Sequence, residues 1–188
     1  MEWVALGIVA VAIIAVAILI ARTKDALRRQ AGDLNKAWSD IEVLLKRQND
    51  DLPRLLQTCR SYMPGEQGAL QIVTESRAAY LKAKSIPEKA SRDAALRSAL
   101  RAMFAQAARY PELKTNSTFS QLQNELLEIE EKIEDRREIF NDDVRRFNRR
   151  LAGPLAGWLA AKMKLRPHAL FEASEKTTKT SAASFKSE

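Results

Sequence analysis

The stretch from Trp3 to Ala21 reads WVALGIVAVAIIAVAILIA and contains no charged residue. At 1.5 Å per helical residue, about 19 residues span roughly 28 Å, close to the hydrocarbon thickness of a bilayer. A helix satisfies its own backbone hydrogen bonds, so lipid can accept it. The sequence therefore predicts a transmembrane anchor over residues 1–21, with Trp3 at the outer interface, Gly7 within the span and Ala21 at its inner end.

A cleaved signal peptide is the main alternative to a retained anchor. It would need a basic segment before a shorter apolar run, whereas only Met1 and Glu2 precede this one. Because Lys and Arg on the flank of a span stay cytoplasmic, the N-terminus should face outward and the rest of the chain should lie in the cytoplasm. The basic flank consists of Arg22, Lys24, Arg28 and Arg29.

The composition favours helix and a reducing compartment. The chain has only six Gly and six Pro in 188 residues, and a single cysteine, so no intramolecular disulfide can form. The formal charge of +7 suits a protein that lies against anionic lipid. Nucleic acid is not expected as a partner, because aromatic residues are sparse and no basic motif carries stacking residues.

Apolar residues recur at helical spacing in four segments after the anchor, and strand-like alternation is absent. Pro53 should kink the first segment, and Arg77 occupies a core position in the second. The four apolar stripes are Leu34, Trp38, Ile41, Leu45, Leu52, Leu55, Cys59 and Tyr62; Leu70, Val73, Tyr80 and Leu81; Leu96, Leu100, Met103, Ala107 and Tyr110; and Phe119, Leu122, Leu126, Ile129, Ile133, Phe140, Val144, Phe147 and Leu151.

Breaks between these segments have recognisable signals. Met63-Pro64-Gly65 should end the first helix, and Pro154 should stop the last. Ser85 with Glu88, and Thr118 with Gln121, have the spacing of capping boxes. Since the connections are short, we expect an all-α fold in which the transmembrane helix is followed by an antiparallel four-helix bundle.

The expected organisation has five parts, in this order: anchor 1–21, juxtamembrane linker 22–33, bundle 34–153, basic amphipathic membrane-proximal segment 154–172, and disordered tail 173–188. In an up-down-up-down bundle the fourth helix returns to the bilayer, and its end is basic. Either this end lies on the membrane surface or it packs against acidic residues of the bundle. Its basic residues are Arg145, Arg146, Arg149 and Arg150, followed by Lys162, Lys164 and Arg166.

No motif points to catalysis, a cofactor or a metal. His168 is the only histidine and no C-x-x-C pair exists, so a zinc site is not expected. Glycine-rich phosphate loops are missing, and Cys59 falls on an apolar stripe. The acidic patch Glu130, Glu131, Glu134 and Asp135 should form ion pairs along a solvated helix face. We therefore predict no catalytic residue, no cofactor-binding residue and no metal ligand.

Three stretches and the anchor resemble the LemA family of bacterial membrane proteins. The stretches are NKAWSDIEVLLKRQNDDLPRL (35–55), YPELKTNSTFSQLQNEL (110–126) and RREIFNDDVRRFN (136–148), and Phe171-Glu172 is similar to the family's closing motif. The second stretch is the most specific. Signature residues that match are Trp38, Arg47, Asp51, Pro53, Tyr110, Pro111, Glu112, Asn141 and Asn148.

The resemblance implies a single-pass protein of the bacterial inner (plasma) membrane with a helical, coiled-coil-like bundle and no established enzymatic activity. The magnetosome protein MamQ is similar to this family, which keeps a membrane-organising role in view. One departure concerns residues 60–66, where the family's histidine is absent. The polar signature residues either form a network that stabilises the bundle or present a partner site.

Two functions follow from these features. The first is a non-catalytic, membrane-anchored scaffold or adaptor whose partners are membrane lipid and other membrane-associated proteins or a second copy of itself. The second is a ligand or signal sensor with a pocket in the bundle near Arg77 and Arg136, because a core-facing arginine is unusual unless it is paired.

Overall fold

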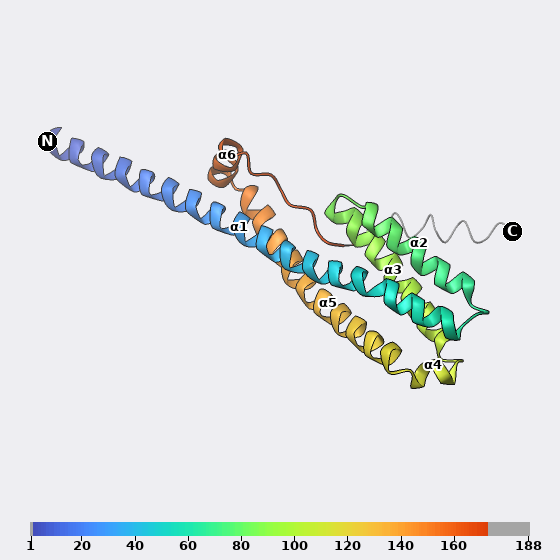
Figure 1. Ribbon diagram of the computed structural model, residues 1–188. Coiled ribbons are helices and arrows are strands. Elements are labelled where there is room, and N and C mark those ends of the chain that lie inside the picture. The colour runs from blue at the N-terminus through green and yellow to red at the C-terminus, as the bar shows by residue number, and fades with distance from the viewer. Residues whose placement is uncertain (1, 173–188) are drawn as a thin grey trace, which may run out of the picture. The chain divides into compact units, whose positions relative to one another are not determined.

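The computed structural model describes residues 2–172, and every regular element in that range is a helix (Figure 1). This confirms the all-α fold with a long apolar helix at its start. The tail expected to be disordered, residues 173–188, lies outside the described residues. The helices are α1 (Glu2–Tyr62), α2 (Gln67–Lys82), α3 (Ile86–Ala107), α4 (Pro111–Thr115), α5 (Ser117–Leu151) and α6 (Pro154–Lys162).

The chain divides into two compact units, which are described separately. Of the described residues, the anchor unit comprises 2–39 and 140–168, and the helical unit comprises 40–139 and 169–172. Both α1 and α5 contribute residues to each unit, so the predicted bundle over residues 34–153 is divided between them.

The apolar anchor is the first part of α1. The helix contains an 18-residue window with a mean hydropathy of 2.6, none of which is buried within the protein, and Trp3 is 86% exposed. An apolar surface of this length fits a single membrane-spanning helix. The linker expected over residues 22–33 is itself helical and continues α1. The helix also continues through Pro53. It ends at Tyr62, directly before Met63, Pro64 and Gly65, where the sequence predicted a helix end.

The core of the helical unit confirms most of the apolar stripes. The edge of the Phe104 ring meets Phe119, with centroids 6.1 Å apart. Two predicted core residues are wrong, because Tyr62 and Leu81 are exposed and Met63 takes the buried place at the end of α1. The core includes Leu52, Leu55 and Cys59 of α1, Met63 directly after it, Leu70 and Val73 of α2, Leu96, Leu100 and Met103 of α3, Leu113 of α4, and Phe119, Leu122 and Leu126 of α5.

The helix starts confirm one capping prediction and correct the other. The Ser85 hydroxyl accepts a hydrogen bond from the Glu88 N–H, and the Glu88 carboxylate accepts from the Lys84 N–H at 3.1 Å. At the start of α5, however, the cap is Asn116 rather than Thr118, since the Asn116 side chain accepts from the Phe119 N–H at 3.0 Å. The helix begins one residue after Asn116, so Thr118 already lies within it.

Candidate functional site

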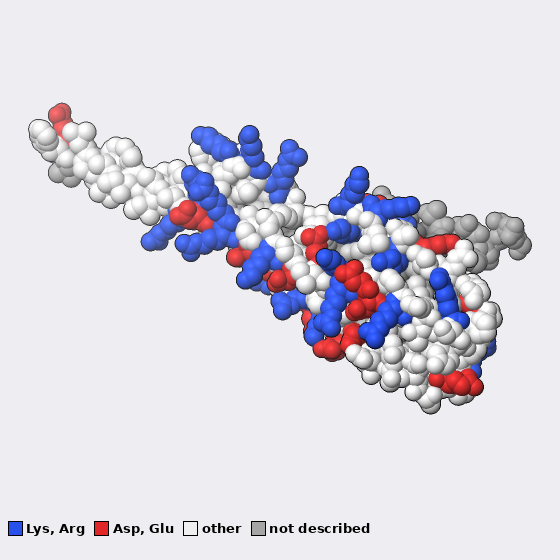
Figure 2. All heavy atoms as spheres, viewed as in Figure 1, with Lys and Arg blue, Asp and Glu red and all other residues white. Residues whose placement is uncertain are grey.

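Charge is distributed unevenly between the two units. The residues of the anchor unit include twelve Lys and Arg against five Asp and Glu, which equals the chain's whole formal charge of +7. The remaining residues carry nineteen of each sign. Figure 2 shows basic side chains gathered where the uncharged part of α1 ends. The basic surface therefore belongs to the unit that contains the apolar span.

Packing within the anchor unit brings the basic end of α5 beside the juxtamembrane part of α1. Leu27 and Leu34 of α1 are buried, as are Phe140 and Phe147 of α5. The rings of Trp38 and Phe140 lie 5.7 Å apart. As a result, two basic clusters far apart in sequence share one unit. Arg145 forms an ion pair with Asp142 at 3.0 Å. These clusters are Arg22, Lys24, Arg28 and Arg29, and Arg145, Arg146, Arg149 and Arg150.

Asn148, on α5, forms hydrogen bonds with the segment that follows α6. Its side-chain amide donates to the His168 carbonyl at 2.8 Å, and its carbonyl oxygen accepts from the His168 N–H at 3.0 Å. The edge of the Phe147 ring meets the imidazole, with centroids 5.6 Å apart. Partial burial lowers the pKa of His168, so the ring is favoured in its neutral form. Asn148 thus has a structural role at the basic end of the unit.

The nine signature residues do not form one cluster. Trp38, Asn141 and Asn148 belong to the anchor unit, and the other six belong to the helical unit. The Tyr110 hydroxyl donates to Glu66 at 3.4 Å, and Pro111 opens α4. One carboxylate oxygen of Asp51 is buried without a hydrogen-bond partner among the described residues.

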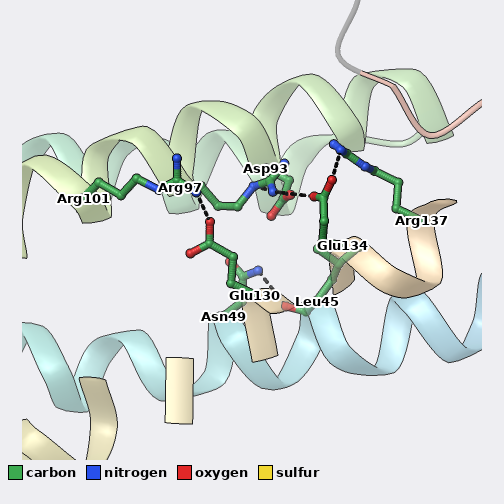
Figure 3. A network of polar contacts seen from close by, with 8 residues as sticks. All are labelled: Leu45, Asn49, Asp93, Arg97, Arg101, Glu130, Glu134 and Arg137. Carbon is green, nitrogen blue, oxygen red and sulfur yellow. Dashed lines mark hydrogen bonds and ion pairs between the residues drawn. The ribbon is translucent and has the colours of Figure 1, made fainter. Parts of the chain in front are cut away.

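A polar network joins α3 to α5 in the helical unit (Figure 3). Asp93 is fully buried, and its carboxylate lies 3.2 Å from Arg97 Nε. Arg97 also pairs with Glu134 at 3.3 Å, and Glu134 pairs with Arg137. One turn along, Arg101 pairs with Glu130 at 2.5 Å. The acidic patch expected on a solvated face is therefore partly an interhelical ladder, because arginines of α3 supply the partners.

Burial dominates the electrostatics of Asp93. Neither carboxylate oxygen accepts a hydrogen bond within the described part of the chain, although Arg97 lies close. Removal of the carboxylate from water raises its pKa from 3.8 to about 6, and Arg97 offsets part of this rise. The burial of Asp93 could not be predicted, because its sequence neighbours are small and basic residues that give no sign of a buried position.

The chemistry available to the described residues is limited. They include no group of three or more His, Cys, Asp or Glu placed to hold a metal ion. Cys59 is buried, and desolvation raises the pKa of its thiol to about 11, which keeps it protonated and unreactive. The geometry therefore offers charged surfaces and pockets rather than an activated nucleophile.

Arg77 and Arg136, the basis of the sensor hypothesis, have different surroundings. Arg77 Nε donates to the Asn49 carbonyl at 2.9 Å. Arg136 is more than half exposed and lies 3.9 Å from Asp40, beside an open pocket of about 460 Å³ that Val43, Leu44 and Lys132 also line. Arg77 is not among the described residues that line this pocket.

Comparison with known proteins gives one family. The family model described as the LemA family matches residues 37–185, which is most of the chain. No curated protein matches it.

Proposed function

This chain belongs to the LemA family, and from that premise we propose that it is a non-catalytic, membrane-anchored helical scaffold or adaptor at the cytoplasmic face of a bacterial membrane. In this proposal the anchor unit holds the protein on lipid, and the helical unit receives membrane-associated proteins or a second copy of the chain.

The observation that carries the proposal is the concentration of positive charge in the unit that contains the apolar span. Each basic side chain close to an anionic membrane surface contributes on the order of 1 kcal/mol to binding. The span alone keeps the chain in the bilayer, so the additional basic residues affect the orientation of the anchor unit at the membrane surface. They favour the leaflet rich in anionic lipid and hold α6 and the end of α5 against it.

The charge and the ion pairs of the helical unit suit the binding of a protein partner. Its described residues carry nearly equal numbers of acidic and basic side chains, so it has little net electrostatic attraction to lipid. Ion pairs such as Arg101–Glu130 and Lys89–Glu42, each at 2.5 Å, join its helices and fix their surfaces. A rigid surface of mixed charge suits recognition of a protein partner, where charge complementarity contributes to specificity.

Two observations support a non-catalytic role. The LemA family is not known as a family of enzymes. The two residues best suited to nucleophilic or proton-transfer chemistry also have structural surroundings: Cys59 is in the core with a raised pKa, and Asn148 holds the backbone of His168.

The alternative, a ligand or signal sensor, rests on the pocket beside Arg136. Arg77 no longer supports it, because the hydrogen bond to Asn49 accounts for an arginine at that position. A soluble ligand would have to bind at an open surface pocket that contains both acidic and basic side chains.

Topology is the first test. Ser184→Cys and Glu2→Cys variants are treated in spheroplasts with a membrane-impermeant maleimide, and the wild-type chain, in which Cys59 is buried, gives the background. We expect the Glu2→Cys variant to be labelled in intact spheroplasts and the Ser184→Cys variant only after permeabilisation. Labelling of the Ser184→Cys variant in intact cells would place the helical unit outside and refute the cytoplasmic proposal.

The scaffold role has a separate test. A photo-crosslinking amino acid is placed at exposed positions of α2 and α3, such as Gln71 and Arg92, in the full chain and in a chain without residues 1–21. Discrete adducts that depend on the anchor would support a membrane-bound adaptor. If neither chain forms adducts at any exposed position of the helical unit, the scaffold proposal is wrong.

A further inference from the structure

A pocket of about 520 Å³ lies within the anchor unit, where the juxtamembrane part of α1 meets α6. Its lining combines two kinds of side chain. Ile20, Trp158 and Leu159 are apolar, and Lys24, Arg28 and Lys162 are cationic. No acidic residue is among the described residues that line it. A pocket that is apolar on one side and cationic on the other matches a ligand that is itself amphipathic and anionic.

The three cations are available to a ligand. The structure records no ion pair within 4 Å between any of them and the described carboxylates. Lys162 Nζ lies over the Trp158 ring, 4.4 Å from its centroid, so the ammonium group is held in place without being neutralised. Arg28 adds a guanidinium, whose planar fork matches two oxygens of a phosphate.

The position of the pocket along α1 defines the level in the membrane at which the pocket would lie. Ile20 belongs to the apolar span, and Lys24 and Arg28 follow one and two turns later. In the membrane-anchored placement proposed above, Ile20 lies beside the head-group end of the acyl chains, while Lys24 and Arg28 lie among the head groups. Trp158 is half exposed on α6, and tryptophan favours this interfacial level.

The wall formed by α6 is held rigidly. Gly157 packs so closely on the end of α5 that a Cβ there would lie 2.8 Å from the Leu151 carbonyl oxygen. Lys164 has a φ of 56°, a left-handed conformation that L-residues rarely adopt, and the Leu165 N–H closes the helix end on the Ala160 carbonyl at 2.9 Å. Together with the Asn148–His168 hydrogen bonds, these features fix the pocket before any ligand arrives.

We propose that this pocket binds the phosphate head group of one anionic phospholipid, with Arg28, Lys24 and Lys162 around the phosphate and Ile20 and Leu159 along the start of an acyl chain. The inference deepens the proposed function, on whose membrane placement it rests. It differs from a diffuse attraction to an anionic surface, because it requires one saturable site per chain and a defined set of side chains.

The test uses the full chain in neutral-detergent micelles, with phosphatidylglycerol or phosphatidylcholine titrated in and bound lipids counted by native mass spectrometry. We expect one phosphatidylglycerol to be retained per chain and no comparable retention of phosphatidylcholine. The double variant Arg28→Gln/Lys162→Gln should lose about 10-fold or more in affinity. The control Lys36→Gln/Lys46→Gln removes the same charge from exposed positions of α1 outside the pocket and should stay within about 2-fold of the wild type.

Three results would overturn the proposal: equal losses in both double variants, binding that does not saturate at one lipid, or displacement of the lipid by millimolar inorganic phosphate. The last would identify a soluble phosphate as the ligand. Circular dichroism checks that each variant remains folded. Because micelles have no sides, a negative result here is independent of the topology test, which concerns orientation alone.

Discussion

Arg77 Nε donates a hydrogen bond of 2.9 Å to the backbone carbonyl of Asn49, the acceptor that Pro53 leaves without its helical donor. In a regular helix the N–H of residue 53 would bind this oxygen, and proline has none. Asn49 is buried, so water cannot replace the missing donor. The guanidinium of Arg77, on α2, therefore supplies the hydrogen bond that Pro53 cannot donate within α1. Arg77 follows the signature residue Pro53 by 24 positions in the sequence.

We expect Arg77→Met to destabilise the protein by about 1–3 kcal/mol, because it leaves a buried carbonyl unsatisfied. In a Pro53→Ala background the helix supplies its own N–H, so the same substitution should cost about half as much or less. The measurement is urea unfolding of the full chain in micelles, followed by circular dichroism, with Arg92→Met as an exposed control. Equal costs in both backgrounds would show that the two residues are not coupled.

Asp93 should make stability depend on pH between about 4 and 6. Its pKa is raised from 3.8 to about 6 mainly by burial, so the folded chain binds a proton in this window that the unfolded chain has released. The contribution of Asp93 to stability is therefore highest below pH 4, and it falls by roughly 1.4 kcal/mol per pH unit until pH 6.

The check is the difference between wild type and Asp93→Asn in urea midpoint, measured from pH 4 to 7. We expect the stability of the wild type relative to the variant to decrease as pH rises. Asp50→Asn, at an exposed position of α1, serves as the control. A pH-independent difference would mean that the buried carboxyl does not titrate in this range.

Cys59 should resist thiol reagents in the folded chain. A pKa of about 11 instead of 9 reduces the thiolate fraction at a given pH by about 100-fold, and burial limits access further. A cysteine introduced at its exposed neighbour by Arg60→Cys should react rapidly under the same conditions. The measurement is the rate of maleimide labelling at pH 7.5 with and without urea, and comparable rates at both positions in the folded state would contradict the burial of Cys59.

Substitutions of two glycines by alanine should have opposite effects. Gly157→Ala would place a Cβ 2.8 Å from the Leu151 carbonyl, so we expect the contact between α5 and α6 to loosen and amides 154–168 to exchange faster with deuterium. Gly32→Ala meets no neighbouring atom within 4 Å in the interior of α1 and should stabilise the helix by about 0.5–1 kcal/mol. Unchanged exchange in Gly157→Ala would argue against the close packing of α6.

The sequence by itself determined the properties that depend on neighbouring residues. Helical periodicity identified the buried stripe from Phe119 to Phe147, and the spacing of Ser85 and Glu88 identified a helix start. The length of the apolar run identified a candidate span. Each is a consequence of local backbone geometry, in which residues three and four apart share a face. At the start of α5 the capping-box spacing pointed to Thr118, whereas Asn116 is the residue that caps the helix.

Tertiary structure decided which of these helix faces are buried against another helix. Leu81 continues an apolar pattern but is exposed, whereas Asp93 stands outside every predicted apolar stripe and is fully buried. Other contacts also join residues that are distant in sequence. Arg77 donates a hydrogen bond to the Asn49 carbonyl, and Arg28 and Lys162 line the same pocket. Burial and charge pairing depend on which helix packs against which, and that choice is made only when the helices come together.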